Sequence, residues 1–477
     1  MSSTKNTVLK TATKKPKAPV FDVREHIVGI DTKVPVLNGK LLPYVNFDNA
    51  ASTPSLREVL QTINDFMPWY SSVHRGTGFK SLVSTETYEQ SRRVVADFFG
   101  ANSREHIVIF GKNSTEALNK LSYRLDLKKD DIVLVSLLEH HSNDLPWRRQ
   151  AQIRRIKIDS FGRLDENHLD QLLKDYKGRV KLVAVTGGSN VTGHVPNIHR
   201  LAKKAHAHGA QILVDCAQLA PHRRIDIKEL KDPTHLDYIV ISAHKMYAPF
   251  GTGALIGRRD TFETGAPELC GGGTIDLVTT NKVEWTSLPD RDEAGSPNVV
   301  GAMALAASLR FLDKIGMQAV AAHEADLTTY ALEKLAQIDK LEIFGEIDPS
   351  NAASRLGVIP FTVKGLKHSK VSAILGTEWG IGVRSGCFCA HPYVTRLLNL
   401  NRQDVNKFGY EVLHGDKRFM PGLVRISFGM YNTKAEVDYL VNALSAIASS
   451  NYQGKYTQDI KTGEYQVAGW HPKISFF

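Results

Sequence analysis

Short apolar runs rich in β-branched residues alternate with longer amphipathic stretches along much of the chain. Five of these runs cover residues 106–110, 132–137, 181–186, 211–214 and 236–242. A short, continuous apolar run between helical stretches is typical of a strand that is buried on both faces of a parallel sheet. The pattern therefore predicts a large α/β domain with a largely parallel sheet over residues 41–300.

The pattern changes after residue 299, where the sequence becomes rich in Ala, Leu and Glu at helical spacing. Long helices are expected there, and they lead into a second domain. Strands are expected at residues 357–363, 380–384 and 423–428, and a closing helix at residues 434–449. We therefore predict a smaller α/β C-terminal domain over residues 301–450.

Four segments lack a strong periodic pattern. Residues 1–20 form a Lys-, Ser- and Thr-rich arm that we expect to be disordered, and residues 21–40 form a segment expected to pack on the small domain. The polar stretch 399–421 is punctuated by glycine and predicts an inserted surface loop, although a role in shaping an acceptor site stays open. Residues 451–477 are interpreted as a tail.

Charge and cysteine content exclude several classes of protein. The net charge of +10 comes from 60 Lys and Arg against 50 Asp and Glu, and five lysines precede the first acidic residue, Asp22. The rest of the chain shows no basic face for nucleic acid, and no apolar run reaches the roughly 20 residues of a membrane span. Four cysteines are too few for a disulfide framework, which favours a reducing, cytoplasmic location. The Cys387-Phe388-Cys389 spacing does not match a zinc knuckle, so no metal site is predicted.

Polar side chains follow the predicted strands, at the edge where open α/β sheets bind ligands. After the first run, Asn113 and Glu116 have the spacing of a capping box, which places Ser114 and Thr115 in the first turn of a helix. Hydroxyl and backbone N–H groups at a helix N-terminus suit a phosphate group. The same motif is also common at helices that bind nothing.

The other runs end in further candidates. His140 and the turn containing Asn190 each have an ordinary structural interpretation as well as a functional one. Asp215, at the end of a buried strand, needs a cation such as a protonated heterocyclic nitrogen, or else an arginine. Lys245 follows the fifth run and is placed for a lowered pKa, so that its neutral amine can form a Schiff base. Together the set predicts pyridoxal phosphate as cofactor.

From residue 44 to residue 433 the chain resembles the class V aminotransferase family, in its cysteine desulfurase and selenocysteine lyase branch of the sulfur-mobilisation type. The motifs are Val73-His74-Arg75-Gly76, Glu139-His140-His141-Ser142-Asn143, Val214-Asp215-Cys216-Ala217-Gln218, Ser242-Ala243-His244-Lys245, Glu293-Ala294-Gly295-Ser296-Pro297-Asn298 and Arg384-Ser385-Gly386-Cys387-Phe388-Cys389-Ala390. The resemblance implies the fold type I of pyridoxal-phosphate-dependent transferases. That fold has a large domain with a mostly parallel seven-stranded sheet and a smaller α/β C-terminal domain.

The resemblance also implies a role for each matching position. Lys245 would hold the cofactor, His140 would stack on its ring, Asp215 would pair with the ring nitrogen and Gln218 would contact the phenolic oxygen. The implied phosphate ligands are Ser114, Thr115, Ser242 and His244, with Ser296 supplied by the other subunit of a homodimer. The implied substrate and sulfur ligands are Asn190 and Arg384 for the carboxylate and Cys389 as sulfur-accepting nucleophile.

The implied activity is the conversion of L-cysteine to alanine with a persulfide on Cys389, which a sulfur-acceptor protein would then discharge. The alternative is another class V enzyme, such as a selenocysteine lyase, another C–S lyase, an aminotransferase or an epimerase, in which Cys389 is not essential. A non-catalytic relative is disfavoured because Lys245, Asp215 and His140 are intact. Cys387 is either a second, resolving thiol or a small apolar loop residue, and the latter is favoured.

Overall fold

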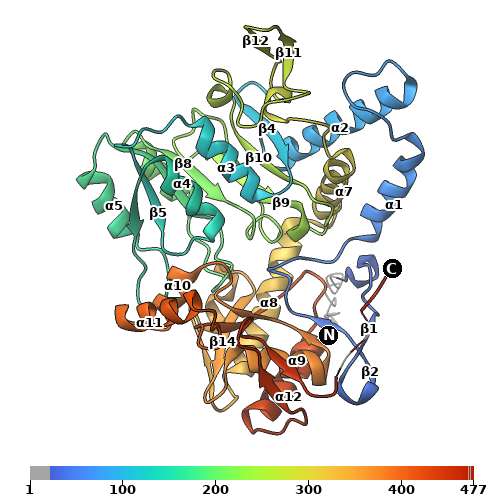
Figure 1. The fold of residues 1–477 in the computed structure, drawn as a ribbon, viewed down its shortest axis with the longest axis vertical. Helices are drawn as coiled ribbons and strands as arrows, with labels where there is room; N and C mark the ends of the chain where they lie inside the picture. Colours follow the sequence, from blue (N-terminus) through green and yellow to red (C-terminus); the bar gives the residue numbers. More distant parts are fainter. Residues whose placement is uncertain (1–21, 471, 473, 477) are drawn as a thin grey trace, which may run out of the picture.

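A seven-stranded sheet forms the centre of the larger of two lobes in the computed structural model, which describes residues 22–470, 472 and 474–476 (Figure 1). The arm predicted for residues 1–20 lies outside the described residues. The sheet order is β4-β10-β9-β8-β7-β5-β6, and only β10 runs antiparallel to its neighbours. The strands are β4 (His106–Gly111), β5 (Ile132–Ser136), β6 (Gln152–Ile156), β7 (Val180–Thr186), β8 (Gln211–Asp215), β9 (Tyr238–Ser242) and β10 (Gly253–Arg258). The predicted fold class is thereby confirmed.

Helices cover both faces of this sheet, because successive side chains of a strand point to opposite sides. In β9, Ile239 and Ile241 belong to one apolar cluster, while Tyr238 and Val240 belong to the other. The first cluster is completed by α2 (Phe79–Phe98), α5 (Glu166–Asp175), α6 (Ile198–His206) and α7 (Val299–Ile315). The second is completed by α3 (Ser114–Arg124) and α4 (Leu145–Gln150). Burial on both faces explains why the central strands read as continuous apolar runs.

Two strands of the sheet were missing from the pattern-based prediction. Strand β6 lies at an edge and contains Arg154 and Arg155, so only Ile156 of this strand is buried. Strand β10 begins within the glycine-rich stretch that resembles a turn. Its glycines permit close packing, since a Cβ at Gly257 would lie 2.5 Å from the ring of Tyr238.

A four-stranded antiparallel sheet of order β13-β14-β17-β16 forms the smaller lobe. Its elements are α8 (Met317–Leu335), β13 (Leu341–Ile343), β14 (Val358–Val363), α9 (His368–Trp379), β16 (Arg384–Gly386), β17 (Leu423–Ser427) and α12 (Lys434–Ala448). The long helices predicted after residue 299 are α7 and α8. The strand expected at 380–384 is instead divided, because β15 (Ile381–Gly382) pairs with β3 (Val45–Asn46) before β16 begins.

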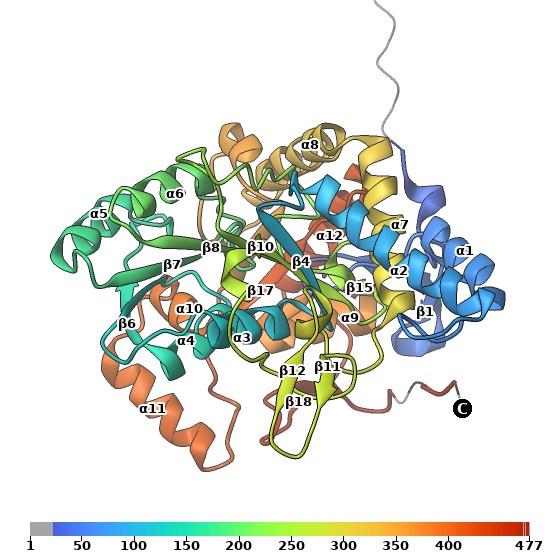
Figure 2. The ribbon, with the colours of Figure 1, turned by 90° about the horizontal axis from the view of Figure 1, so that it is seen from above.

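The stretch predicted as an inserted loop contains a helix, α11 (Arg402–Leu413), which follows α10 (His391–Leu397) and lies at the edge of the molecule (Figure 2). The loop prediction was therefore wrong. Asn401 and Asp404 form a complete capping box at the start of α11. None of its residues is buried, although Val405, Phe408 and Val412 recur at helical spacing, a signal in the sequence that could have revealed the helix.

Both chain ends contribute short strands. Strands β1 (Lys33–Pro35) and β2 (Leu41–Pro43) form a hairpin near Gly380 in the smaller lobe, whereas Val23 and Ile27 join the core of the larger lobe. The tail contains the hairpin β18 (Tyr456–Gln458) and β19 (Tyr465–Val467), in which the Tyr456 hydroxyl donates to Glu378 of α9 at 2.8 Å. The remaining α-helix is α1 (Arg57–Phe66), and the remaining strands are β11 (Ile275–Val278) and β12 (Val283–Trp285). Among the described residues, no helix combines the length and apolar character that a membrane crossing requires.

Candidate functional site

A cavity of about 290 Å³ lies at the carboxyl ends of the central strands, where the two lobes meet. This volume is close to the lower end of the range for small-molecule sites, roughly 300–1,000 Å³. Eleven of the twelve residues that the sequence singled out line it: Ser114, Thr115, His140, Asn190, Asp215, Gln218, Ser242, His244, Lys245, Arg384 and Cys389. The twelfth, Ser296, lines a separate depression with His74 and Arg75.

One end of the cavity is formed by the N-terminus of α3. Asn113 caps this helix by accepting a hydrogen bond from Glu116 N at 3.0 Å, whereas the Glu116 carboxylate accepts from Lys112 N rather than from Asn113 N. Only half of the predicted capping box is therefore present. Ser242 links the helix to β9, because its hydroxyl accepts from Ser114 N at 2.9 Å and donates to Ser114 Oγ at 2.8 Å. Backbone N–H groups and hydroxyls thus converge at a helix end that favours an anion.

Gly253→Ala tests how closely α3 must approach β9. A Cβ at Gly253 would lie 2.7 Å from the backbone of Asn113 and 2.6 Å from Ile241 O. We expect the helix N-terminus to be displaced, with a loss of about 1–3 kcal/mol in unfolding free energy and a roughly tenfold higher dissociation constant for pyridoxal phosphate. Denaturant unfolding and a cofactor titration measure the two effects.

Gly376→Ala is the matched control, since a Cβ there meets nothing within 4 Å and Gly376 lies inside α9. Alanine has the higher helix propensity, so unchanged or slightly raised stability is expected. Equal cofactor affinity in both variants would contradict the role assigned to the close approach of α3.

His140, Asp215 and Gln218 lie around the middle of the cavity. Burial, reinforced by the nearby Lys245 charge, lowers the pKa of His140 to about 4, so its ring is neutral at physiological pH. Ser142 N donates to His140 Nδ1 at 3.1 Å, which places the remaining ring proton on Nε2. Burial raises the pKa of Asp215, which accepts a hydrogen bond from Ala217 N at 3.0 Å. A cation above this carboxyl group would offset the cost of its ionisation.

Lys245 ends the short helical turn directly after β9. Burial lowers the pKa of its amine to about 8, although the nearby Asp215 carboxyl acts in the opposite direction. A substantial fraction of Lys245 is therefore neutral and nucleophilic near physiological pH.

The loop that carries Cys389 is held in an unusual backbone conformation. Phe388 and Cys389 have φ values of 52° and 55°, both in the left-handed region. Such residues cost about 1–3 kcal/mol each and need support from their surroundings. His141 N donates to Cys389 O at 2.7 Å, and Asn190 Nδ2 donates to Phe388 O at 2.8 Å. Asn190 therefore fixes the loop, while the Cys389 side chain is exposed to the cavity.

Cys387 differs from Cys389 in its surroundings. It is buried, and its thiol donates to Pro421 O at 3.1 Å. Burial, with a smaller contribution from Cys389, raises the pKa of this thiol to about 12. These surroundings support the interpretation of Cys387 as a packed loop residue, because a thiolate is needed for sulfur exchange.

The sequence analysis missed Arg425, a buried guanidinium that lines the cavity beside Arg384. The two arginines are direct cross-strand partners on β17 and β16. Arg425 donates to Asp48 Oδ1 at 2.9 Å and to Asn190 O at 2.9 Å, and Arg384 Nη1 lies 3.7 Å from Asp48 Oδ2. Arg425 is the only charged residue in the apolar run 423–428, which is a signal that could have identified it.

Glu139, directly before His140, is a second residue with no role in the sequence analysis. It is buried, and burial raises the pKa of its carboxyl group to about 8 despite three hydrogen-bond donors. These donors are Thr186 N at 2.9 Å, Asn143 Nδ2 at 2.7 Å and the Ser136 hydroxyl. Glu139 thereby ties the end of β5 to the end of β7 and positions the turn that carries His140.

The model of the family described as aminotransferase class-V matches residues 45–440. The chain belongs to the class V aminotransferase family. It is 34% identical over 436 residues to a protein named cysteine desulfurase from Haloferax volcanii, with 89% of this chain and 95% of that protein covered. A protein named probable cysteine desulfurase from Staphylococcus aureus strain N315 is 33% identical, with 89% and 96% covered.

Solved structures of this family share the fold of the chain. The apo structure of a cysteine desulfurase from Thermococcus onnurineus NA1 has a TM-score of 0.75 at 32% identity, with 85% of this chain and 95% of that chain covered. The cysteine desulfurase CsdA from Escherichia coli has a TM-score of 0.71 at 28% identity, with 86% and 96% covered. The chain thus spans nearly the full length of each of these relatives.

Proposed function

We propose that this chain is a pyridoxal-phosphate-dependent cysteine desulfurase that converts L-cysteine to alanine and carries the sulfur on Cys389. The observation that carries the proposal is the position of Lys245 and Cys389 on one cavity, together with Asp215, His140 and two arginines. The names of relatives that match nearly the whole chain support L-cysteine as substrate.

The residues present fit the cofactor. Gln218 Oε1 is buried and has no hydrogen-bond partner among the described residues, which leaves this amide available to a ligand. Asp215 would pair with the ring nitrogen, His140 would lie against the ring and Lys245 would hold the aldehyde. The phosphate would be held at the N-terminus of α3 by Ser114, Thr115, Ser242 and His244. When bound, pyridoxal phosphate supplies an electron sink for proton removal from Cα.

The chain's own groups account for substrate orientation and proton transfer. Arg384 and Asn190 would bind the substrate carboxylate, for which a forked guanidinium is well shaped, and Arg425 lies beside Arg384 on the neighbouring strand. Asp48 holds the Arg425 guanidinium in place. With a pKa of about 8, the Lys245 amine can remove the Cα proton and return a proton to the product near neutral pH.

Cys389 receives the sulfur. The C–S bond of the substrate breaks and a new S–S bond forms between the substrate sulfur and Cys389 Sγ, so cysteine and an enzyme thiol become alanine and an enzyme persulfide. No external oxidant is required, because Cβ keeps the electron pair of the broken C–S bond and takes up a proton to become the methyl group of alanine. The exposed position of Cys389 supports transfer from this persulfide to an acceptor protein or a small thiol.

The quaternary structure and location are further parts of the proposal. Ser296 lies outside the cavity of its own chain, which supports a homodimer in which it reaches the partner's phosphate site. All four cysteines are free, which supports a reducing compartment such as the cytoplasm.

Alanine formation from L-cysteine tests the proposal directly. The protein, saturated with pyridoxal phosphate, is assayed with and without a thiol reductant. We expect about one alanine per chain without reductant and continuous turnover with it, because the persulfide must be discharged before the next cycle. No alanine under either condition would refute the proposed activity.

The pH dependence of cofactor loading tests the environment of Lys245. Only the neutral amine attacks an aldehyde, and its pKa of about 8 means that half is neutral at about pH 8. In cofactor-free protein, the rate of loading should rise up to about pH 8 and level off above it, whereas an ordinary lysine of pKa about 10.4 would keep rising. Stopped-flow absorbance measures this rate, and a continued rise beyond about pH 10 would contradict the lowered pKa.

A further inference from the structure

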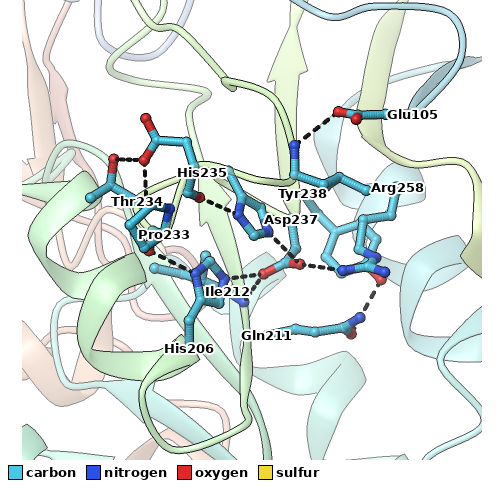
Figure 3. Close-up of polar contacts among 12 residues, drawn as sticks. Glu105, His206, Gln211, Ile212, Pro233, Thr234, His235, Asp237, Tyr238 and Arg258 are labelled. Carbon is cyan, nitrogen blue, oxygen red and sulfur yellow. Dashed lines mark hydrogen bonds and ion pairs between the residues drawn. The ribbon is translucent and has the colours of Figure 1, made fainter.

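Two histidines and an aspartate meet at the edge of the large sheet opposite the cavity (Figure 3). His206 is the last residue of α6, His235 lies in the loop before β9, and Asp237 directly precedes that strand. The imidazole rings are stacked with centroids 4.1 Å apart and planes inclined by 21°. The Asp237 side chain is 1% exposed, that of His235 9% and that of His206 18%.

Hydrogen bonds to the backbone define which ring nitrogens carry protons. His206 Nδ1 lies 3.0 Å from Pro233 O (Figure 3). His235 Nδ1 lies 2.7 Å from Asp232 O. A carbonyl oxygen can only accept, so each Nδ1 carries a hydrogen. In the neutral form of each ring, Nε2 then has no hydrogen and carries a lone pair, so it cannot donate a hydrogen bond.

Both of these Nε2 atoms point at the Asp237 carboxylate. His206 Nε2 lies 2.8 Å from Oδ2, and His235 Nε2 lies 3.2 Å from Oδ1. Two neutral histidines would therefore place lone pairs against carboxylate oxygens, which is repulsive unless a positive charge lies between them. Protonation of both rings is one solution, but it stacks two like charges and adds them to Arg258, whose Nη1 already lies 3.3 Å from Oδ1.

We propose that His206, His235 and Asp237 bind a divalent transition-metal ion, with Zn²⁺ as the best match. Two imidazole nitrogens and one carboxylate, with water as fourth ligand, form a ligand set that zinc accepts in proteins. Hydrogen bonding of Nδ1 to a backbone carbonyl is the usual outer support of a metal-binding histidine. The ligand atoms all lie within 4.8 Å of one another, and tetrahedral zinc with bonds of about 2.0 Å spaces its ligands about 3.3 Å apart.

The charged groups next to the site are compatible with a bound cation. Arg258 also donates from Nε to Asp260 Oδ1 at 3.0 Å, so it keeps a carboxylate partner when a metal takes its place on Asp237. Ile212 N donates to Asp237 Oδ2 at 2.8 Å and holds the carboxylate in position. The partly exposed ring of His206 gives the ion a route from solvent.

The ion would join the end of α6 to the stretch around His235 and Asp237, which leads directly into β9. Strand β9 leads to Ser242, His244 and Lys245 at its other end. The site is distinct from the cavity and serves the stability of the large lobe, not the reaction. The sequence analysis predicted no metal site, because it considered only the Cys387-Phe388-Cys389 spacing. The three ligands proposed here are spread over 32 positions of the sequence and form no compact motif.

Isothermal titration with ZnCl₂ tests the proposal in the cofactor-loaded protein, with Cys270→Ser and Cys389→Ser as background to remove both exposed thiols. We expect one zinc ion per chain. His206→Gln and His235→Gln, each in that background, should weaken binding at least tenfold. His208→Gln is the matched control, because His208 follows the same helix and donates to Lys204 O but lies outside the cluster. It should bind zinc as the parent does.

Anomalous scattering at the zinc edge, from parent crystals soaked in ZnCl₂, locates the ion without any substitution that could disturb folding. A peak between His206, His235 and Asp237 supports the proposal. The proposal is overturned if the parent binds no zinc, if the peak lies elsewhere, or if both glutamine variants bind as tightly as the parent.

Discussion

Lys245→Ala is expected to lower alanine formation from L-cysteine by about 10³-fold or more. The substitution removes the amine that would hold the cofactor and also the base that would remove the Cα proton, and a positioned base alone contributes about 10²–10⁴-fold. The residual rate is measured with excess pyridoxal phosphate, so that weak binding of the cofactor does not hide the effect. The visible absorbance of the purified protein should disappear in the same variant.

Lys245→Arg is the matched control for charge. It retains a cation next to Asp215, so a purely electrostatic role of Lys245 would leave much of the activity in place. Because a guanidinium neither attacks an aldehyde nor loses a proton near neutral pH, we expect this variant to be as inactive as the alanine variant. Substantial turnover by either variant would remove Lys245 from the proposed chemistry.

Cys389→Ser is expected to lower turnover by about 10²-fold or more while leaving the fold intact. Serine can adopt the same left-handed backbone, and the carbonyl that accepts from His141 N is retained. A hydroxyl is a far weaker nucleophile toward sulfur than a thiolate, so the acceptor step should fail. Mass spectrometry of the intact protein after exposure to L-cysteine should find a persulfide in the parent and none in the variant.

Cys270→Ser is the corresponding control, because Cys270 is exposed but does not line the cavity. Full activity is expected from it. If Cys389→Ser kept the parent's rate of sulfide and alanine release, the persulfide route would be wrong, and another class V reaction would take its place.

The central strands and most of the cavity could be predicted from the sequence, because apolar runs buried on both faces leave a clear pattern. Residues 211–214 lead into Asp215 and residues 236–242 lead toward Lys245, so local sequence alone places both at the same edge of the sheet. Strand β6 was not found this way because only Ile156 of it is buried, and helix α11 was missed because its few apolar residues stand among polar ones and Gly409.

Side chains that meet only through tertiary structure were the other omission. Arg425 reaches the cavity because β17 pairs with β16, a pairing that no local pattern encodes. His206 and His235 come together because the end of α6 lies next to the loop that precedes β9. Ser296 was assigned to the phosphate site only through the family resemblance, and it lies outside the cavity of its own chain.

The anchoring of the Cys389 loop limits how sulfur can leave the enzyme. The carbonyl groups of Phe388 and Cys389 accept hydrogen bonds from Asn190 and His141 of the larger lobe, although the loop continues from strand β16 of the smaller lobe. A large movement of the loop backbone would have to break both hydrogen bonds at once. Delivery of sulfur should therefore depend on rotation of the Cys389 side chain about its Cα–Cβ bond, and an acceptor must bring its own thiol to the mouth of the cavity.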